Sequence, residues 1–131
     1  MYYGDISNNN IEGQGIYIWS DGRKFEGDWV NNQMHGKGVF TWPDKRSFVG
    51  DYFNDKKHGY GVFVWPDGRS YDGFWSNGKQ EGVGIYINAQ GEQKYGEWQA
   101  GKRLAWKTED DYNKGKLECQ AKHKSQREGK A

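Results

Sequence analysis

The chain has 131 residues, enough for one domain, and seven Trp, nine Tyr and six Phe carry its large apolar surface, whereas leucine occurs only at Leu104 and Leu117. This composition excludes a leucine-rich helical bundle. The formal net charge of +1 comes from interspersed basic and acidic residues, which argues against a dedicated nucleic-acid surface.

The chain repeats itself every 23 residues, and both aromatic residues and glycines keep this step. The main aromatic series are Phe25, Phe48, Tyr71 and Trp29, Tyr52, Trp75, Trp98. An unbroken period of this length is typical of stacked repeats. Because aromatic residues suit strands and glycines suit tight turns, we predict that residues 1–106 form one all-β stack of antiparallel hairpins.

The first copy of the repeat, residues 1–24, is a weakened version of the later ones. Ile6 stands where the other copies have Trp or Tyr, and three asparagines, residues 8–10, fill the loop position. Terminal repeats of a stack are expected to be atypical. This copy is therefore either an end cap or a domain cut short, and we favour the cap.

Each full copy is expected to form two strands. Residues 25–30 and 36–42 alternate with period two, and residues 31–34 form a loop between them. A turn of the Asp-Gly kind, with left-handed torsions, links each copy to the next. Lys45 stands where this turn has glycine in the sister copies. A left-handed lysine costs roughly 1 kcal/mol or more, so we predict that Lys45→Gly stabilises the domain.

Alternation along the strands places the aromatic residues and glycines on one face of the sheet and mixed residues on the other. About nine strands at ~4.8 Å spacing give a ribbon on the order of 40 Å long, which should twist strongly. The sequence leaves the curvature open. The aromatic face either closes on itself or lines an open trough.

The repeat pattern fails near the C-terminus. Ala105 and Lys107 replace the paired glycines, so a regular second strand is not expected in the fifth copy. Residues 107–131 form a charged tail that opens, at residues 108–111, like a helix N-terminus. Gly115 is expected to interrupt this helix, and the apolar positions of the tail make a poor stripe. We expect a short helical or disordered tail that its own sheet or a partner orders.

Two segments, YDGFWSNGKQEGVG (residues 71–84) and FVGDYFNDKKHGYG (residues 48–61), resemble the MORN (membrane occupation and recognition nexus) repeat. The resemblance covers about four copies, with departures at Ile6, Phe74 and Lys94. It implies an elongated, twisted, single-layer antiparallel sheet of stacked hairpins that acts as a scaffold. In this family a grooved face is known to hold the helix of a partner.

A single sheet leaves a large aromatic patch uncovered, and such patches usually mark an interface. We therefore predict a non-enzymatic scaffold or adaptor that binds a helix or extended segment, from a partner protein or from its own tail, along the aromatic face. The predicted anchors are Trp29, Tyr52, Trp75 and Trp98, flanked by Phe40 and Phe63. The single cysteine, Cys119, and the lack of an apolar signal core or membrane-spanning run predict an intracellular protein, and the resemblance favours a cilium, axoneme or other cytoskeletal assembly. A subunit of another large complex is equally compatible.

The alternative function is a membrane-surface module that contacts anionic phospholipid. Its predicted contacts are Arg23, Arg46 and Arg69, which form a basic column at one edge of the stack. Each arginine follows an aspartate by two positions, at Asp21, Asp44 and Asp67. A salt-bridged, solvated edge is the simpler interpretation, so protein partners are favoured over lipid.

No motif indicates catalysis, a cofactor or a metal. His35 and His58 are equivalent residues about 10 Å apart, too far to share a metal ion. Cys119 and His123 lack a third ligand or base and are interpreted as surface residues. The paired glycines lack the strand-loop-helix context of a phosphate loop, so we interpret them as making room for neighbouring rings.

Overall fold

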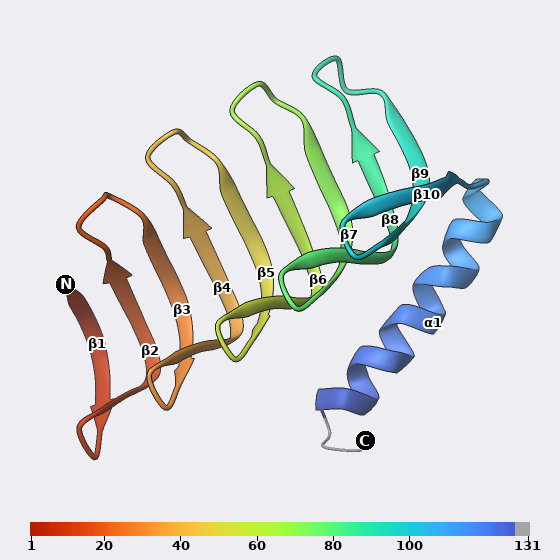
Figure 1. Cartoon of the computed structure of the whole chain (residues 1–131). Helices are drawn as coiled ribbons and strands as arrows, with labels where there is room; N and C mark the ends of the chain where they lie inside the picture. The colour runs from red at the N-terminus through yellow and green to blue at the C-terminus, as the bar shows by residue number, and fades with distance from the viewer. Residues whose placement is uncertain (128–131) are drawn as a thin grey trace.

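The computed structural model describes residues 1–127, with side chains through His123, and shows ten antiparallel strands followed by one helix (Figure 1). The strands are β1 (Tyr2–Ser7), β2 (Asn10–Ile18), β3 (Lys24–Val30), β4 (Gln33–Thr41), β5 (Ser47–Phe53), β6 (Lys56–Val64), β7 (Ser70–Ser76), β8 (Lys79–Ile87), β9 (Gln93–Gln99) and β10 (Lys102–Trp106). Helix α1 is Glu109–Arg127. Residues 128–131 of the predicted tail lie outside the described residues.

The strands form a single open sheet in which the spatial order equals the chain order, so the predicted fold class is confirmed. β10 corrects the expected end of the stack. It pairs with β9 although its paired glycines are lost, but it has five residues, whereas the even strands before it have nine. Strand pairing needs only backbone groups, and these residues still supply them.

The turns differ in detail from the prediction. The expected four-residue loop is a two-residue turn, Asn31 (φ 48°) and Asn32 (φ 67°), whose paired positive torsions are those of a type I′ hairpin. Asparagine tolerates this conformation well. The Asp-Gly connection is longer and has one left-handed residue, Gly22 (φ 96°). Lys45 (φ 78°) occupies the equivalent position, so its predicted left-handed conformation is confirmed.

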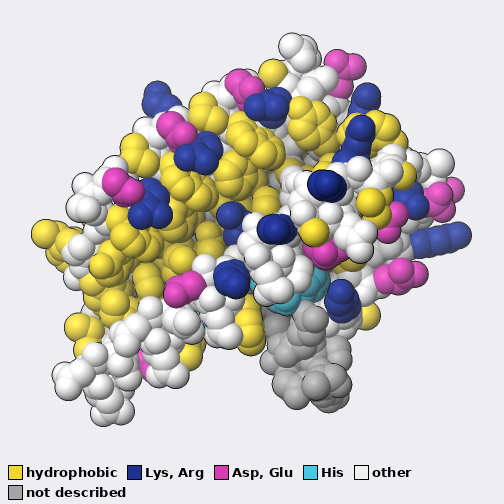
Figure 2. Space-filling model, viewed as in Figure 1, with side chains coloured by type: hydrophobic (Ala, Val, Ile, Leu, Met, Phe, Trp, Pro, Cys, Tyr) yellow, Lys and Arg dark blue, Asp and Glu magenta, His cyan; other side chains and the backbone are white. Residues whose placement is uncertain are grey.

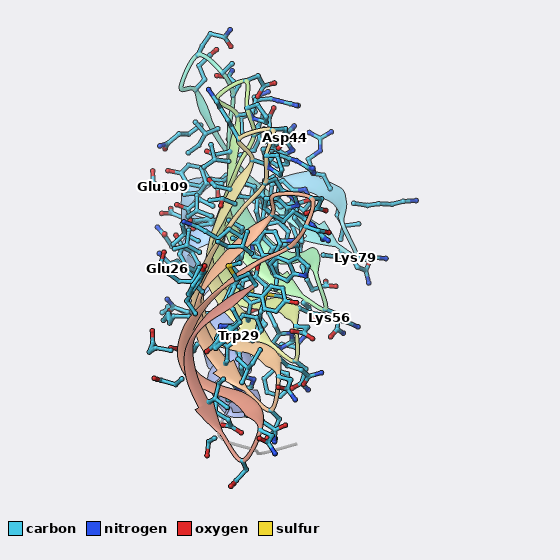
Figure 3. The ribbon with its side chains drawn as sticks, turned by 90° about the vertical axis from the view of Figure 1, so that its left-hand side faces the viewer. Glu26, Trp29, Asp44, Lys56, Lys79 and Glu109 are labelled. Atoms are coloured by element: carbon cyan, nitrogen blue, oxygen red, sulfur yellow. The ribbon has the colours of Figure 1, made fainter. Side chains whose placement is uncertain are left out.

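A β-bulge in each repeat bends the sheet into a trough. The bulge lies between Gly27 and Trp29 in β3 and recurs in β5 and β7. Asp28 lies at the first of these bulges, and its Oδ2 accepts a hydrogen bond from the backbone N–H of Lys37 at 3.1 Å. Bulges bend strands and increase their twist. Figure 3 shows the result: Trp29 lies inside the bend and Glu26 on its outer side.

The glycines make room for the rings inside the trough. A Cβ atom on Gly38 would lie 2.1 Å from Cζ of Phe25, and one on Gly61 would lie 2.2 Å from Cζ of Phe48. This confirms the steric interpretation of the paired glycines. The rings then pack edge to face from repeat to repeat; Phe48, for example, meets Trp75 at 5.3 Å and 88°. A continuous aromatic core runs along the stack.

Helix α1 lies on the other side of the sheet, which we call the outer face. It begins with a cap in which Thr108 Oγ1 accepts a hydrogen bond from the Asp111 N–H at 3.1 Å, and it packs against β6, β8 and β9. Gly115 does not interrupt the helix. It permits close contact, because a Cβ atom there would lie 2.6 Å from Cγ1 of Val83. Helix α1, the described part of the chain's own tail, therefore does not occupy the trough.

The departure of Phe74 from the repeat pattern explains where the helix packs. Phe74 stands where the preceding repeat has the bulge residue Asp51, and its side chain is only 1% exposed beneath α1. Its ring stacks on His123 at 5.8 Å and 3°. His123 is 8% exposed and Cys119 is partly buried, so the interpretation of these two as surface residues was wrong.

Candidate partner-binding groove

The six residues predicted to bind a partner lie together inside the trough, but they are nearly covered by one another. Their exposed fractions lie between 3% and 8%. Two of the indoles are also held by the backbone: Nε1 of Trp29 donates to the carbonyl oxygen of Gly15 and Nε1 of Trp75 to that of Gly61, both at 3.1 Å. These rings form the core of the repeats. Their role in binding stays a prediction.

A second row of rings borders the trough and is partly exposed. This tryptophan row consists of Trp19, Trp42 and Trp65. Each of these rings packs on a ring of the core, as Trp42 does on Phe40 at 4.4 Å and on Phe63 at 5.5 Å. Figure 2 shows the broad hydrophobic surface that results. The 23-residue period contained this row too, but periodicity alone does not distinguish covered from exposed rings.

Two neighbouring recesses lie between the tryptophan row and the two-residue turns. The first, the apolar recess, has a volume of about 330 Å³ and is lined by Ile11, Tyr17, Trp19, Trp29, Asn32, Met34 and Asp55. The second, the basic recess, has a volume of about 250 Å³ and is lined by Arg23, Met34, Phe40, Trp42, Tyr52, Asp55, Lys56, Lys57 and Gly78. They share Met34 and Asp55, so they form one groove.

The arginines of the predicted lipid contact are engaged with their neighbours. Arg46 Nε lies 2.7 Å from Asp44 Oδ2, and its guanidinium carbon lies 5.2 Å from the centre of the Trp42 ring. Arg23 and Arg69 make the same pair of contacts in their repeats. The backbone N–H of Arg46, and then its side chain, lower the pKa of Asp44. Acidic and basic side chains accordingly alternate along the rim in Figure 2.

Lys57 is a cation inside the groove. Its Nζ lies 5.5 to 5.7 Å from the centres of four rings, those of Trp42, Phe48, Phe63 and Trp75. Burial lowers the pKa of this ammonium, and the charge of Arg46 adds to the effect. Ring faces stabilise a cation, but they leave its charge uncompensated.

A family model for the MORN repeat matches four consecutive segments, residues 2–22, 25–45, 48–68 and 71–93. The chain belongs to the MORN-repeat family. Comparison with curated proteins finds no match to the chain. MORN repeats are generally protein- or membrane-interaction modules, and the proteins that carry them are generally non-catalytic repeat modules.

The third MORN repeat differs from its neighbours at the groove. Across each hairpin an aromatic ring pairs with a residue of the next strand: Trp29 with Met34, Tyr52 with Lys57, and Trp75 with Gln80. Only the third repeat combines the smaller tyrosine ring with a cation. The basic recess lies at this position.

The histidines lie on the outer side of the MORN repeats. The Phe53 ring packs between the rings of His35 and His58, at 4.9 and 5.9 Å, and the His58 ring meets that of His123 at 4.9 Å. Within residues 1–127, no group of three or more His, Cys, Asp and Glu side chains is arranged to hold a metal ion. No helix in the described part of the chain is long and apolar enough to cross a membrane.

Proposed function

We propose that this MORN-repeat protein is a non-enzymatic scaffold or adaptor that binds a helical or extended segment of a protein partner in the groove. The observation that carries the proposal is the tryptophan row. Two of its partly exposed indoles, Trp19 and Trp42, line the groove, Trp65 continues the row in the next repeat, and the aromatic core lies beneath them. Tryptophan is among the residues that most often dominate binding energy at protein contacts.

The position of α1 supports the same proposal. The helix covers apolar residues of the outer face, and none of its residues lines either recess. The two faces therefore have different roles. The outer face binds the chain's own helix, and the trough is available to another segment.

The rim supports a protein partner over phospholipid. Each arginine of the basic column is paired with an aspartate at 2.7 to 2.8 Å, which cancels much of the positive field that anionic headgroups need. As its cellular setting we propose a ciliary or other cytoskeletal assembly, and the family resemblance is the support for that setting. Imaging of the tagged full chain in ciliated cells tests it.

The binding proposal is tested with the full chain and a display library of helical peptides of about 20 residues. Selected peptides should bind the chain and lose affinity about tenfold or more with Trp42→Ala, the loss expected for a hot-spot ring. Trp106→Ala is the matched control, because Trp106 is 42% exposed but lies on β10, outside both recesses. Thermal melting of both variants confirms folding.

Two results would reject protein binding in the groove. One is the selection of no peptide above background, and the other is peptides that bind Trp42→Ala as well as the natural chain. Flotation with anionic liposomes at low ionic strength tests the alternative. Binding that disappears when Arg23, Arg46 and Arg69 are neutralised would favour the membrane-surface module.

A further inference from the structure

The groove repeats, but one part of it does not. Successive MORN repeats offer nearly the same rings, so apolar contacts alone would allow a partner to bind in several positions that differ by one repeat. A partner that must lie in one position needs a contact that occurs once. Charged or polar residues at single positions are a well-established way to set the register of packed helices.

Lys57 is such a contact. The equivalent residues in the preceding and following repeats are Ile11, Met34 and Gln80; at the end of the stack Arg103 is also a cation, but it is exposed and lines neither recess. Lys57 is partly buried, and Figure 3 shows its neighbour Lys56 at the edge of the trough together with Lys79 of the next repeat. Among the described residues, no carboxylate forms an ion pair with Lys57. It is a cation held by rings and without an anion.

The charged residues that line the basic recess are mostly positive, like Lys57 itself. Three cationic residues, Arg23, Lys56 and Lys57, line it with one acidic residue, Asp55. One carboxylate oxygen of Asp55 is already hydrogen-bonded within the protein, because its Oδ1 accepts a hydrogen bond from the Met34 N–H at 2.7 Å. The apolar recess beside it has Asp55 and no cation in its lining. The two recesses therefore attract different side chains.

We propose that the partner of this groove is an amphipathic helix that carries one acidic residue within its apolar stripe, and that this carboxylate binds Lys57 in the basic recess. The inference rests on the proposed function, since it names the chemistry of the segment bound there. A carboxylate would supply the counter-charge that the rings do not. The smaller ring of Tyr52 helps to leave the space that it would enter.

The repeat spacing predicts the rest of the stripe. One MORN repeat advances the stack by two strand spacings, about 9.6 Å, and a helix rises about 1.5 Å per residue. A helix along the groove would thus meet equivalent positions every six to seven residues. We expect the acidic residue to lie about one such step from an apolar residue that enters the apolar recess beside Trp19 and Met34.

The test uses the full chain and the helical peptide library, with every position of the stripe randomised. Selection against the natural chain should enrich Glu or Asp at one stripe position. Replacing that residue by Gln should weaken binding about tenfold or more, the range of a charge-assisted hydrogen bond. Lys57→Met, which copies Met34 of the preceding repeat, should remove the difference between the acidic and Gln peptides. Lys79→Met, at the exposed first residue of β8 outside the recess, should keep this difference.

The outcomes separate this inference from the proposed function. Peptides that depend on Trp42 but show no acidic enrichment would overturn the inference and leave groove binding intact. Acidic peptides that bind Lys57→Met as well as the natural chain would also overturn it. If no peptide depends on Trp42, the proposed function fails and the inference fails with it. A Lys57→Glu chain that prefers Lys over Glu at the same peptide position would confirm the contact.

Discussion

Phe74→Asp should release helix α1 and leave the stack of MORN repeats folded. The change restores the residue type of the preceding repeats, where Asp28 and Asp51 accept a hydrogen bond from the next strand; for Asp51 the donor is the Tyr60 N–H at 3.2 Å. The new carboxylate should make the equivalent bond to the Val83 N–H. The repeat itself should therefore stay folded.

The free energy that Phe74→Asp removes is judged against the small contact that holds helix α1 on the sheet. Its buried apolar residues are Phe74, Val83 and Tyr112. At about 2 kcal/mol each, their burial contributes about 6 kcal/mol before the entropy of ordering the helix is subtracted. Removing a buried Phe ring costs about 3–5 kcal/mol. The remaining contact is too weak to hold 19 residues against the sheet.

Cys119 provides the assay, because it is the only cysteine in the sequence and its side chain lies between helix α1 and the sheet. A Cβ atom on Gly82 would lie 2.6 Å from its Sγ, and burial raises the pKa of its thiol. Thiol modification should be slow in the natural chain. In Phe74→Asp it should be at least about 100-fold faster, since each 1.4 kcal/mol of lost docking raises the exposed population tenfold. Hydrogen exchange of residues 109–123 should increase in parallel.

Leu117→Asp is the matched control, because it also replaces an apolar residue by aspartate, but on helix α1 itself and at a side chain that is 69% exposed. It should leave the modification rate of Cys119 unchanged. An unchanged rate in Phe74→Asp would show that Phe74 does not hold the helix. Loss of the cooperative melting of the sheet would show instead that the ring is part of the repeat core.

Three further predictions concern the stability of the stack. Lys45→Gly should raise the free energy of unfolding by about 0.5–1 kcal/mol by relieving its positive φ, and Gly68→Lys, where a Cβ meets open space, should lower it by a similar amount; a lower melting temperature for the first variant would contradict the strain. Gly38→Ala should lower the free energy of unfolding by about 3 kcal/mol, because the new methyl group overlaps the buried ring of Phe25. Urea unfolding measures this loss, and an unchanged midpoint would contradict the packing. Burial raises the pKa of Tyr52 and Tyr71, so stability should be fully present below pH 10 and should fall as the pH rises above it; a flat melting temperature across that range would contradict the burial.

The sequence predicted most of the sheet because its signals are local and repeated. The 23-residue step, the period-two alternation and the paired glycines together indicate a stack of hairpins, and each depends only on neighbouring strands. The turn at Lys45 was predictable for the same reason. The short asparagine turn was misassigned because Asn-Asn and Asp-Gly pairs both favour left-handed torsions, and only the register of the strands distinguishes them.

The candidate site was less predictable because exposure depends on curvature. Trp29 and Trp42 have the same residue type and the same period, yet the bend at the bulge buries the first and leaves the second partly exposed. The rings around Lys57 come from β5, β7, its own strand β6 and the turn that follows β4. No pattern within one repeat contains all four rings, because two of them belong to the neighbouring repeats.

The amino-acid sequence by itself determined the repeat, the strands and the face on which the rings gather, since these depend on side-chain alternation between adjacent strands. The tertiary structure decided which rings are covered, that α1 packs on the outer face, and that Lys57 lies among four rings with no ion-pair partner in the described part of the chain. Those facts depend on how the bulges bend the sheet and on contacts between distant segments. Phe74 illustrates the difference. The repeat pattern shows that a phenylalanine at this position is a departure, and only the packed helix explains why it is there.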